Sequence, residues 1–280
     1  MKPFDEKKRS GQLFEYDMKL GSINKIPADC QPDFMNLNMV NVDPDEVVYR
    51  IYSLDRFLEL AQTRQNTLVN TKLWEDPFEN FLLGCQAQFS DGRIIDMSNV
   101  RDSWYGQCWS YKEECDGLWR TNTAAKTHRA IKVKTTIGRL FQSFYDFTNQ
   151  FHSICYFIGK IEYIDKNDIL TFLKTTSASD AARDTSNISQ MRSLLFKRKE
   201  FGYEQEVRLL YCTEANGRSK QCVFQYGIDP NVLFDEIVID PWATDSDVQW
   251  ITNQLQGFGI TIPIIKSDLY SQNKAVILFS

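Results

Sequence analysis

Histidine and paired cysteines are scarce in this chain, and their scarcity argues against several kinds of site. There are two histidines, His128 and His152, in 280 residues. The seven cysteines form no Cys-x-x-Cys pair, and their number is odd. A zinc site needs clustered cysteine or histidine ligands, and a disulfide framework normally uses an even number of cysteines. We therefore expect no metal centre and predict reduced thiols, as in the cytoplasm.

Long apolar runs and nucleotide-binding loops are also missing. No run of 18 or more apolar residues occurs, and the opening MKPFDEKKRS has no apolar segment like that of a signal peptide. These two observations predict a cytoplasmic protein. The patterns GxxxxGK[ST], GxGxxG and GxSxG are absent, so neither a phosphate loop, a dinucleotide fingerprint nor a serine nucleophile elbow is indicated.

What the chain does contain is typical of a globular protein. Apolar residues make up 42% of it, charged residues 25% and aromatic residues 13%, which is enough to bury a thick core. The formal net charge is −5, which argues against general binding to polyanions. The segment KTHRAIKVKTTIGR, residues 126–139, is the one candidate for a basic groove, although a basic strand-and-turn surface is the simpler interpretation.

The order of patterns predicts an N-terminal arm over residues 1–44 and a single α+β domain over residues 45–280. Strands are indicated by β-branched and aromatic runs, and helices by apolar residues at helical spacing. The predicted strands cover 47–53, 66–74, 105–111, 128–134, 154–164, 203–211, 220–228, 234–240 and 260–270, with a hairpin turn at Asn216–Gly217. The predicted helices cover 54–65, 76–83, 118–127, 137–151, 191–201 and 242–259, the last of them ending at Gly257 or Gly259. In the helix at DPFENFLL, Asp76 and Glu79 would form a capping box.

Two glutamates in FGYEQEVRLLY raise the question of function. If this run is a strand, Glu204 and Glu206 point to the same face, with Arg208 next along it. Like charges so close together repel each other and tend to raise a pKa. The pair is therefore either a solvated edge or one half of an active site.

Four segments, taken in order, resemble the bacterial domain-of-unknown-function family 2971. They are VVYRIYS, KLWEDPFEN, QCWSYKEECDGLWR and FGYEQEVRLLY. The strongest signals are the DPFE box, the CWS…GLWR block and the YEQEVR strand. The resemblance covers about residues 47–270.

That pattern is in turn similar to the ADP-ribosyltransferases with an Arg, Ser, Glu-x-Glu triad. This second resemblance implies a mixed, largely antiparallel split sheet with flanking helices, which grips NAD and cleaves its nicotinamide bond. It implies that Arg50 binds the NAD phosphates. Ser110 would brace the ribose next to the nicotinamide, and Glu206 would stabilise the oxocarbenium-like transition state. Glu204 would take the proton from the acceptor.

Further residues enter the cofactor site by the same resemblance. Tyr203 would belong to the acceptor-recognition turn, and Tyr49 and Trp109 would line the NAD pocket, although a core position is the simpler interpretation of both. Where the group usually has Ser-Thr-Ser, this chain has Cys-Trp-Ser, with Trp109 facing away from Ser110.

The predicted function is therefore NAD-dependent ADP-ribosyl transfer, or NAD hydrolysis where water is the acceptor. NAD would be the substrate, no metal would be needed, and the acceptor would be a protein or a nucleic acid. By analogy we expect an effector that acts as a bacterial toxin or in phage defence. Two alternatives stay open: a non-catalytic ligand or nucleic-acid binding module, and a Mg-dependent nuclease that uses Asp76, Glu204 and Glu206.

Overall fold

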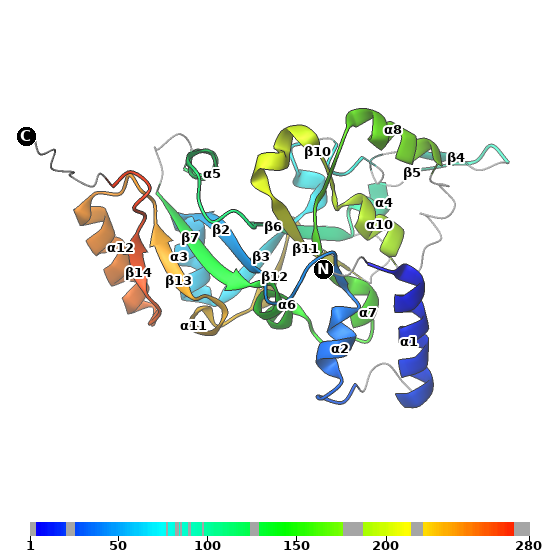
Figure 1. Cartoon of the computed structure of the whole chain (residues 1–280), viewed down its shortest axis with the longest axis horizontal. Coiled ribbons are helices and arrows are strands. Elements are labelled where there is room, and N and C mark those ends of the chain that lie inside the picture. The colour runs from blue at the N-terminus through cyan, green and yellow to red at the C-terminus, as the bar shows by residue number, and fades with distance from the viewer. Residues whose placement is uncertain are drawn as a thin grey trace, which may run out of the picture. The chain divides into compact units, whose positions relative to one another are not determined.

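The computed structural model describes residues 4–20, 26–76, 78–81, 84, 86–88, 91–96, 98–123, 129–175, 187–213 and 221–271. It is a mixed α+β structure whose strands pair mostly antiparallel, as the sequence predicts (Figure 1). The chain divides into two compact units. The first consists of Met1–Val48, Asn66–Tyr111 and Thr136–Gly227, and the second of Tyr49–Gln65, Lys112–Thr135 and Ile228–Ser280.

The centre of the first unit is the strand β11 (Glu206–Cys212), all seven residues of which are buried. It pairs antiparallel with β6 (Trp104–Ser110) on one side and with β8 (Tyr156–Lys160) on the other. β1 (Met39–Val40) runs parallel to β8, while β3 (Gln65–Asn70) pairs with β6 and with β12 (Val223–Gly227). Since a strand flanked on both sides and buried on both faces is held along its whole length, β11 is a rigid base for side chains at its start.

Short elements surround this sheet (Figure 1). Two small pairs of strands are β4 (Gln86–Gln88) with β5 (Ile94–Asp96), and β9 (Glu162–Ile164) with β10 (Phe196–Arg198). The helices are α1 (Glu6–Leu20), α2 (Gln31–Asn36), α4 (Ser98–Arg101), α6 (Ile137–Phe144), α7 (His152–Cys155), α8 (Lys166–Thr175) and α10 (Ile188–Ser193). The 3-10 helices are η2 (Thr71–Leu73) and η3 (Lys199–Glu204).

The N-terminal helix α1 is fastened to this unit by a buried arginine. Arg9 is 3% exposed and donates two hydrogen bonds to the side-chain oxygen of Asn38 and one to the backbone oxygen of Ser153. Asn38 in turn donates to the same oxygen of Ser153 and to that of Tyr156. The arm and domain boundaries predicted from the sequence, 1–44 and 45–280, stay predictions.

The strands that belong mainly to the second unit pair in the order β2 (Val47–Ser53), β7 (Ala130–Thr136), β13 (Glu236–Ile239) and β14 (Ile264–Lys266). β7 and β13 are antiparallel and β13 and β14 parallel. Its helices are α3 (Leu54–Thr63), α5 (Asp116–Asn122), α11 (Pro230–Leu233) and α12 (Asp245–Gly257). Thr244 and Asp247 form a reciprocal capping box that fixes the start of α12.

The basic segment over 126–139 is described from Arg129 onward, and two of its charges there have acidic partners. Arg129 pairs with Asp247 at 2.8 Å, and the buried Lys132 pairs with Glu114 at 3.2 Å. These contacts support the interpretation as a structural strand rather than a basic groove.

Several predicted elements differ from the structure or fall outside it. Over the described residues 78–81 the chain forms a turn in place of the predicted helix, and Asp76 accepts a hydrogen bond from the backbone nitrogen of Phe78 at 2.9 Å. The predicted helix over 191–201 ends at Ser193 and gives way to β10. The hairpin turn predicted at Asn216–Gly217 lies outside the described residues.

Candidate active site

The start of β11 and the end of β6 lie at the same end of this antiparallel strand pair. In the antiparallel register, Glu206 is directly opposite Ser110, and Arg208 is opposite Cys108. Glu206 and Arg208 are two residues apart on a strand and therefore share a face. Both are buried, Glu206 at 3% and Arg208 at 0% exposure. A charged pair this deep must be fully partnered to be stable.

Glu206 is held as an ionised carboxylate. Arg208 donates from Nε to Oε1 at 2.8 Å, and Lys197 donates from Nζ to Oε2 at 3.0 Å. Burial alone would raise the pKa of Glu206, but Arg208, Lys197 and a hydrogen bond with Cys108 bring it down to about 2. At neutral pH this group therefore carries a fixed negative charge.

Lys197 on β10 is the hub of the cluster. Its ammonium nitrogen lies 2.8 Å from Glu79, 2.6 Å from Glu204 and 3.0 Å from Glu206. The ring of Phe201 covers it, with the nitrogen 4.9 Å from the ring centroid. Burial would lower the pKa of Lys197, but the carboxylates raise it above the ordinary value, so the lysine stays charged.

Arg208 completes the cluster from the strand side. Its guanidinium donates to Glu79 at 2.9 Å and to the backbone oxygen of Leu194 at 2.7 Å. It also lies 4.3 Å from the ring centroid of Trp74. That stacking needs a glycine on β6, because a Cβ on Gly106 would come within 2.5 Å of the Trp74 ring.

The resulting cluster carries more negative than positive charge. Three carboxylates, Glu79, Glu204 and Glu206, face two cations, Lys197 and Arg208. Glu204 is the most exposed of the three carboxylates, with 23% of its side chain accessible. The excess negative charge therefore reaches solvent at Glu204.

A short helical turn, and not the strand itself, brings Glu204 to this place. The strand begins at Glu206, Glu204 is the last residue of η3, and Gln205 between them has a left-handed backbone with φ of 46°. The prediction that the two glutamates lie on one strand, pointing to the same face, is therefore wrong. Ser110 anchors the turn by donating from Oγ to the backbone oxygen of Glu204 at 2.6 Å.

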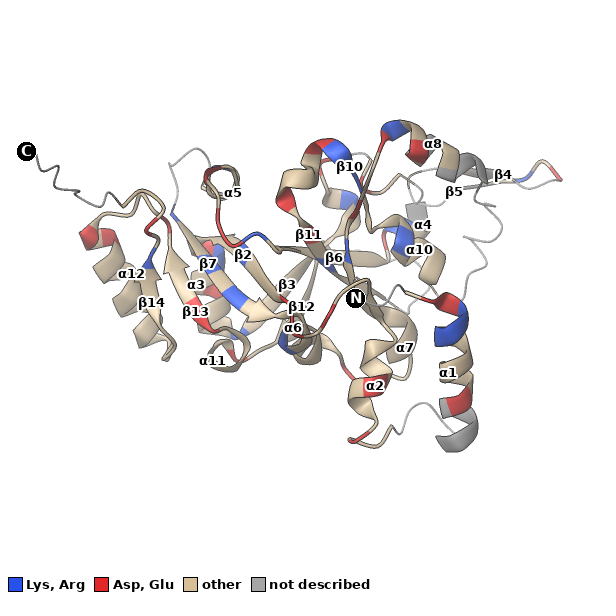
Figure 2. Cartoon of the chain, viewed as in Figure 1, with Lys and Arg blue, Asp and Glu red and all other residues tan. Residues whose placement is uncertain are grey.

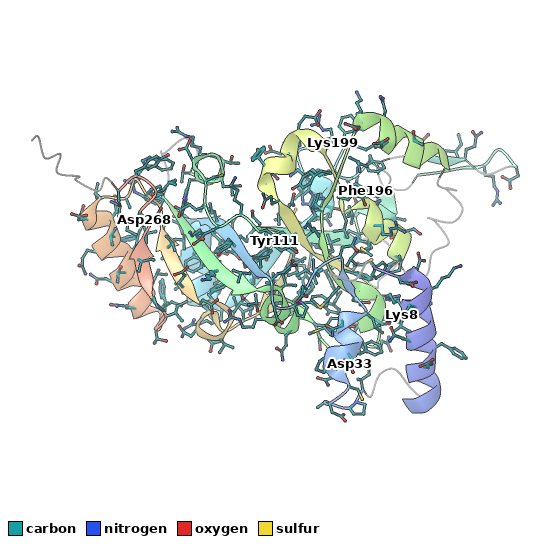
Figure 3. The ribbon with its side chains drawn as sticks, in the orientation of Figure 1. Lys8, Asp33, Tyr111, Phe196, Lys199 and Asp268 are labelled. Atoms are coloured by element: carbon teal, nitrogen blue, oxygen red, sulfur yellow. The ribbon has the colours of Figure 1, made fainter. Side chains whose placement is uncertain are left out.

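Aromatic rings and basic residues border the cluster. Tyr203 on η3 is 50% exposed, and Tyr163 accepts a hydrogen bond from the backbone nitrogen of Glu206 at 2.9 Å. Figure 2 shows the basic residues of β10 in blue, and Figure 3 labels Phe196 and Lys199 on either side of this stretch. Arg198 on the same strand pairs with Asp76 at 3.1 Å. Asp76 thus has a partner of its own beside the cluster.

Three of the predicted site residues come together in this unit, namely Ser110, Glu204 and Glu206. Trp109 is 2% exposed and donates from Nε1 to Gln107 at 2.9 Å, so it is a buried core side chain. Tyr49 and Arg50 belong to the second unit, on β2. There the Lys132 nitrogen lies 5.6 Å from the Tyr49 ring centroid, and the Arg50 guanidinium lies 4.9 Å from that of Tyr52.

Lys197 and Glu79 are the members that sequence reasoning missed. In the sequence, the DPFE pattern predicts that Glu79 caps a helix, and the basic run FKRK predicts that Lys197 is solvated. A buried lysine in such a run has the same sequence signature as a solvated one, so the chain offers no local signal for it.

Comparisons with known proteins add fold-level findings only. No protein-family model matches the chain, and no curated protein matches it. Among solved structures, the chain is similar to Thermus sp. 2.9 DarT in complex with NAD+, with 8% identity and a TM-score of 0.34 over 81% of this chain and 98% of that one. The same DarT in complex with ADP-ribosylated ssDNA has 9% identity and a TM-score of 0.36 over 80% and 94%.

A likeness at these TM-scores carries no argument about the site, and the resemblance to domain-of-unknown-function family 2971 stays a prediction. Any function must be argued from the cluster itself. Among the described residues, no group of three or more histidine, cysteine or acidic side chains is arranged to hold a metal ion. Over the same part of the chain, no helix combines the length and apolar character needed to cross a membrane.

Proposed function

We propose that this chain binds NAD, cleaves the bond between its nicotinamide and ribose, and transfers ADP-ribose to a protein or nucleic-acid acceptor or to water. The observation that carries the proposal is the excess negative charge of the buried cluster, which opens to solvent at Glu204 beside Ser110. Cleavage of this bond turns a neutral sugar into a cation, so a fixed anion stabilises the transition state more than the ground state.

The reaction uses the two glutamates in different ways. The bond between the ribose C1′ atom and the pyridinium nitrogen breaks, its electron pair leaves with neutral nicotinamide, and the sugar becomes an oxocarbenium ion. Glu206 supplies buried negative charge that favours this cation. An acceptor oxygen or nitrogen then bonds to C1′, and Glu204, the most accessible of the three carboxylates, takes its proton.

The remaining predicted residues would hold NAD and the acceptor. Arg50 would bind the phosphates, since its planar fork matches their oxygens. Tyr49 would contact the cofactor, and Tyr203, half exposed next to Glu204, would contact the acceptor. Trp109, whose ring is buried, would support the cofactor site indirectly, through its hydrogen bond to Gln107. The proposal extends to an effector role in a bacterial cell, as a toxin or in phage defence.

The test measures nicotinamide release from NAD by chromatography, with EDTA present in the reaction. We expect release by the wild type, a loss of at least about 100-fold in Glu206→Gln, and little change in Glu200→Gln, an exposed acid on the same turn. Cell lysate or single-stranded DNA with radiolabelled NAD then identifies the class of acceptor.

Three outcomes would contradict the proposal and point elsewhere. Equal release by wild type and Glu206→Gln would place the chemistry outside the cluster. NAD binding in calorimetry without release would indicate a binding module. Nucleic-acid cleavage that requires Mg²⁺ and stops with EDTA would indicate the nuclease alternative.

A further inference from the structure

Lys197 makes an unusual number of charged contacts for one lysine. An ammonium group has three N–H donors, and here three carboxylates surround it, at 2.8, 2.6 and 3.0 Å. The side chain is 9% exposed, and Phe201 covers the nitrogen. The lysine has no donor left for a ligand, so its part in any reaction has to act through the carboxylates.

The spacing of the carboxylates depends on this nitrogen. The bonded oxygens of Glu204 and Glu206 lie within 2.6 and 3.0 Å of the same atom, so they are at most about 6 Å apart. Two like charges at that separation repel each other unless a cation lies between them. Arg208 contacts Glu206 and Glu79. Lys197 contacts Glu204 as well as Glu206, so it joins the partly exposed glutamate to the buried one.

We infer that Lys197 is a positioning residue that holds Glu204 beside Glu206 and sets the pH range in which the site works. The inference rests on the proposed function and deepens it. Without Lys197, three carboxylates would face the single cation Arg208. Glu204 would then swing toward solvent, and Glu206 would take up a proton at higher pH.

Several other groups also face these carboxylates. Tyr163 contacts Glu206 from β9, Cys108 contacts it from β6, and Glu79 approaches from the turn after η2. Tyr163 stays protonated at neutral pH, since burial, opposed by the hydrogen bond from the Glu206 backbone, raises its pKa to about 12. None of these neighbours supplies a second positive charge.

The test compares Lys197→Met, which removes the charge, with Lys197→Arg, which keeps it. The control is Lys199→Met, which alters an exposed lysine paired with Asp165. In nicotinamide release, we expect Lys197→Met to lower kcat at least tenfold with a smaller change in KM. We also expect it to move the acid limb of the pH profile up by about 1 to 3 units. Lys197→Arg should leave the acid limb in place and lower kcat, because a planar guanidinium cannot direct donors from one nitrogen to three separate carboxylates.

A second measurement does not depend on activity. Carbon-13 NMR of the side-chain carboxyl of Glu206 should show its titration at higher pH in Lys197→Met than in the wild type, and no movement in Lys199→Met. If wild-type protein releases no nicotinamide, the proposed function fails while this titration still decides the role of Lys197.

An unmoved titration of Glu206 in Lys197→Met would overturn the inference, as would an unmoved acid limb in an active protein. Circular dichroism shows whether Lys197→Met folds. If it does not, Lys197→Arg decides alone: a fall in kcat at an unchanged acid limb supports the inference, and an unchanged kcat overturns it.

Discussion

The paired strands β6 and β11 have charged residues at one end and aromatic residues at the other. Where β11 begins, Glu206 faces Ser110 and Arg208 faces Cys108, and the neighbours are a lysine and two further carboxylates. Five residues along, Tyr211 faces Tyr105. There the neighbours are rings: Tyr211 stacks on Phe224 with centroids 4.0 Å apart.

This difference indicates that the aromatic end stabilises the fold, whereas the charged end contributes little to stability. Aromatic rings bury large apolar surfaces without a desolvation penalty, so the far end stabilises the fold at little cost. Buried ion pairs give little net stability, because the Coulomb attraction is offset by the loss of hydration. We propose that the five charged side chains gathered at the start of β11 serve catalysis rather than stability.

The largest effect should come from opening the aromatic end. Trp104 is fully buried, packs on Phe157 with centroids 6.1 Å apart, and donates to Gln190 at 3.0 Å. We expect Trp104→Ala to lower the free energy of unfolding by about 3 to 5 kcal/mol in urea titrations. Trp250→Ala, at a half-exposed ring, should change it by less than about 0.5 kcal/mol. Equal effects of the two substitutions would mean that the far end is not a core.

An intermediate effect should come from protonating the charged end. The pKa of Glu206 falls from 4.5 to about 2 on folding, so its contribution is complete above pH 4.5 and is lost as the pH falls toward 2. The full loss, reached below pH 2, should be about 3 kcal/mol in the free energy of unfolding, and more than half of it should appear between pH 5 and pH 3. Urea titrations at pH 5, 4 and 3 check this. Glu206→Gln should show a flatter pH dependence than the wild type, and parallel curves would contradict the assignment.

The smallest effect should come from the turn that carries Glu204. Ser110→Ala removes one hydrogen bond to the backbone of Glu204, which we expect to cost about 1 kcal/mol of stability. Nicotinamide release should fall by more than this modest loss of folding implies, because Glu204 would lose its position. Ser246→Ala, at an exposed serine in α12, is the matched control. If release falls equally in both, Ser110 has only a structural role.

The sequence predicts the strands that carry this site better than the side chains that interact in it. The strand patterns of β2, β6, β7, β8, β11 and β13 are strong because each is a run of β-branched or aromatic residues. Ser110 and Glu206 follow from those strands. The sequence also predicts Glu204 in the strand, but Gln205 has a left-handed backbone, so the strand begins only at Glu206.

The contacts of Lys197 and Glu79 could not be predicted because they are long-range. Glu79 reaches Arg208 across 129 positions of the chain, and the local DPFE pattern offers a sufficient explanation for it on its own. Whether a lysine in FKRK is buried depends on which carboxylates the fold brings to it. Local propensity and periodicity contain no information about such pairs.

The most direct measurement compares the two ends of the strand pair in one assay. It is kcat/KM for nicotinamide release by Glu206→Gln and by Trp104→Phe, each at matched concentrations of folded protein. We predict a loss of at least about 100-fold for Glu206→Gln and a change within about twofold for Trp104→Phe. Equal losses, or no release by folded wild-type protein, would contradict the claim that the charged end is an active site.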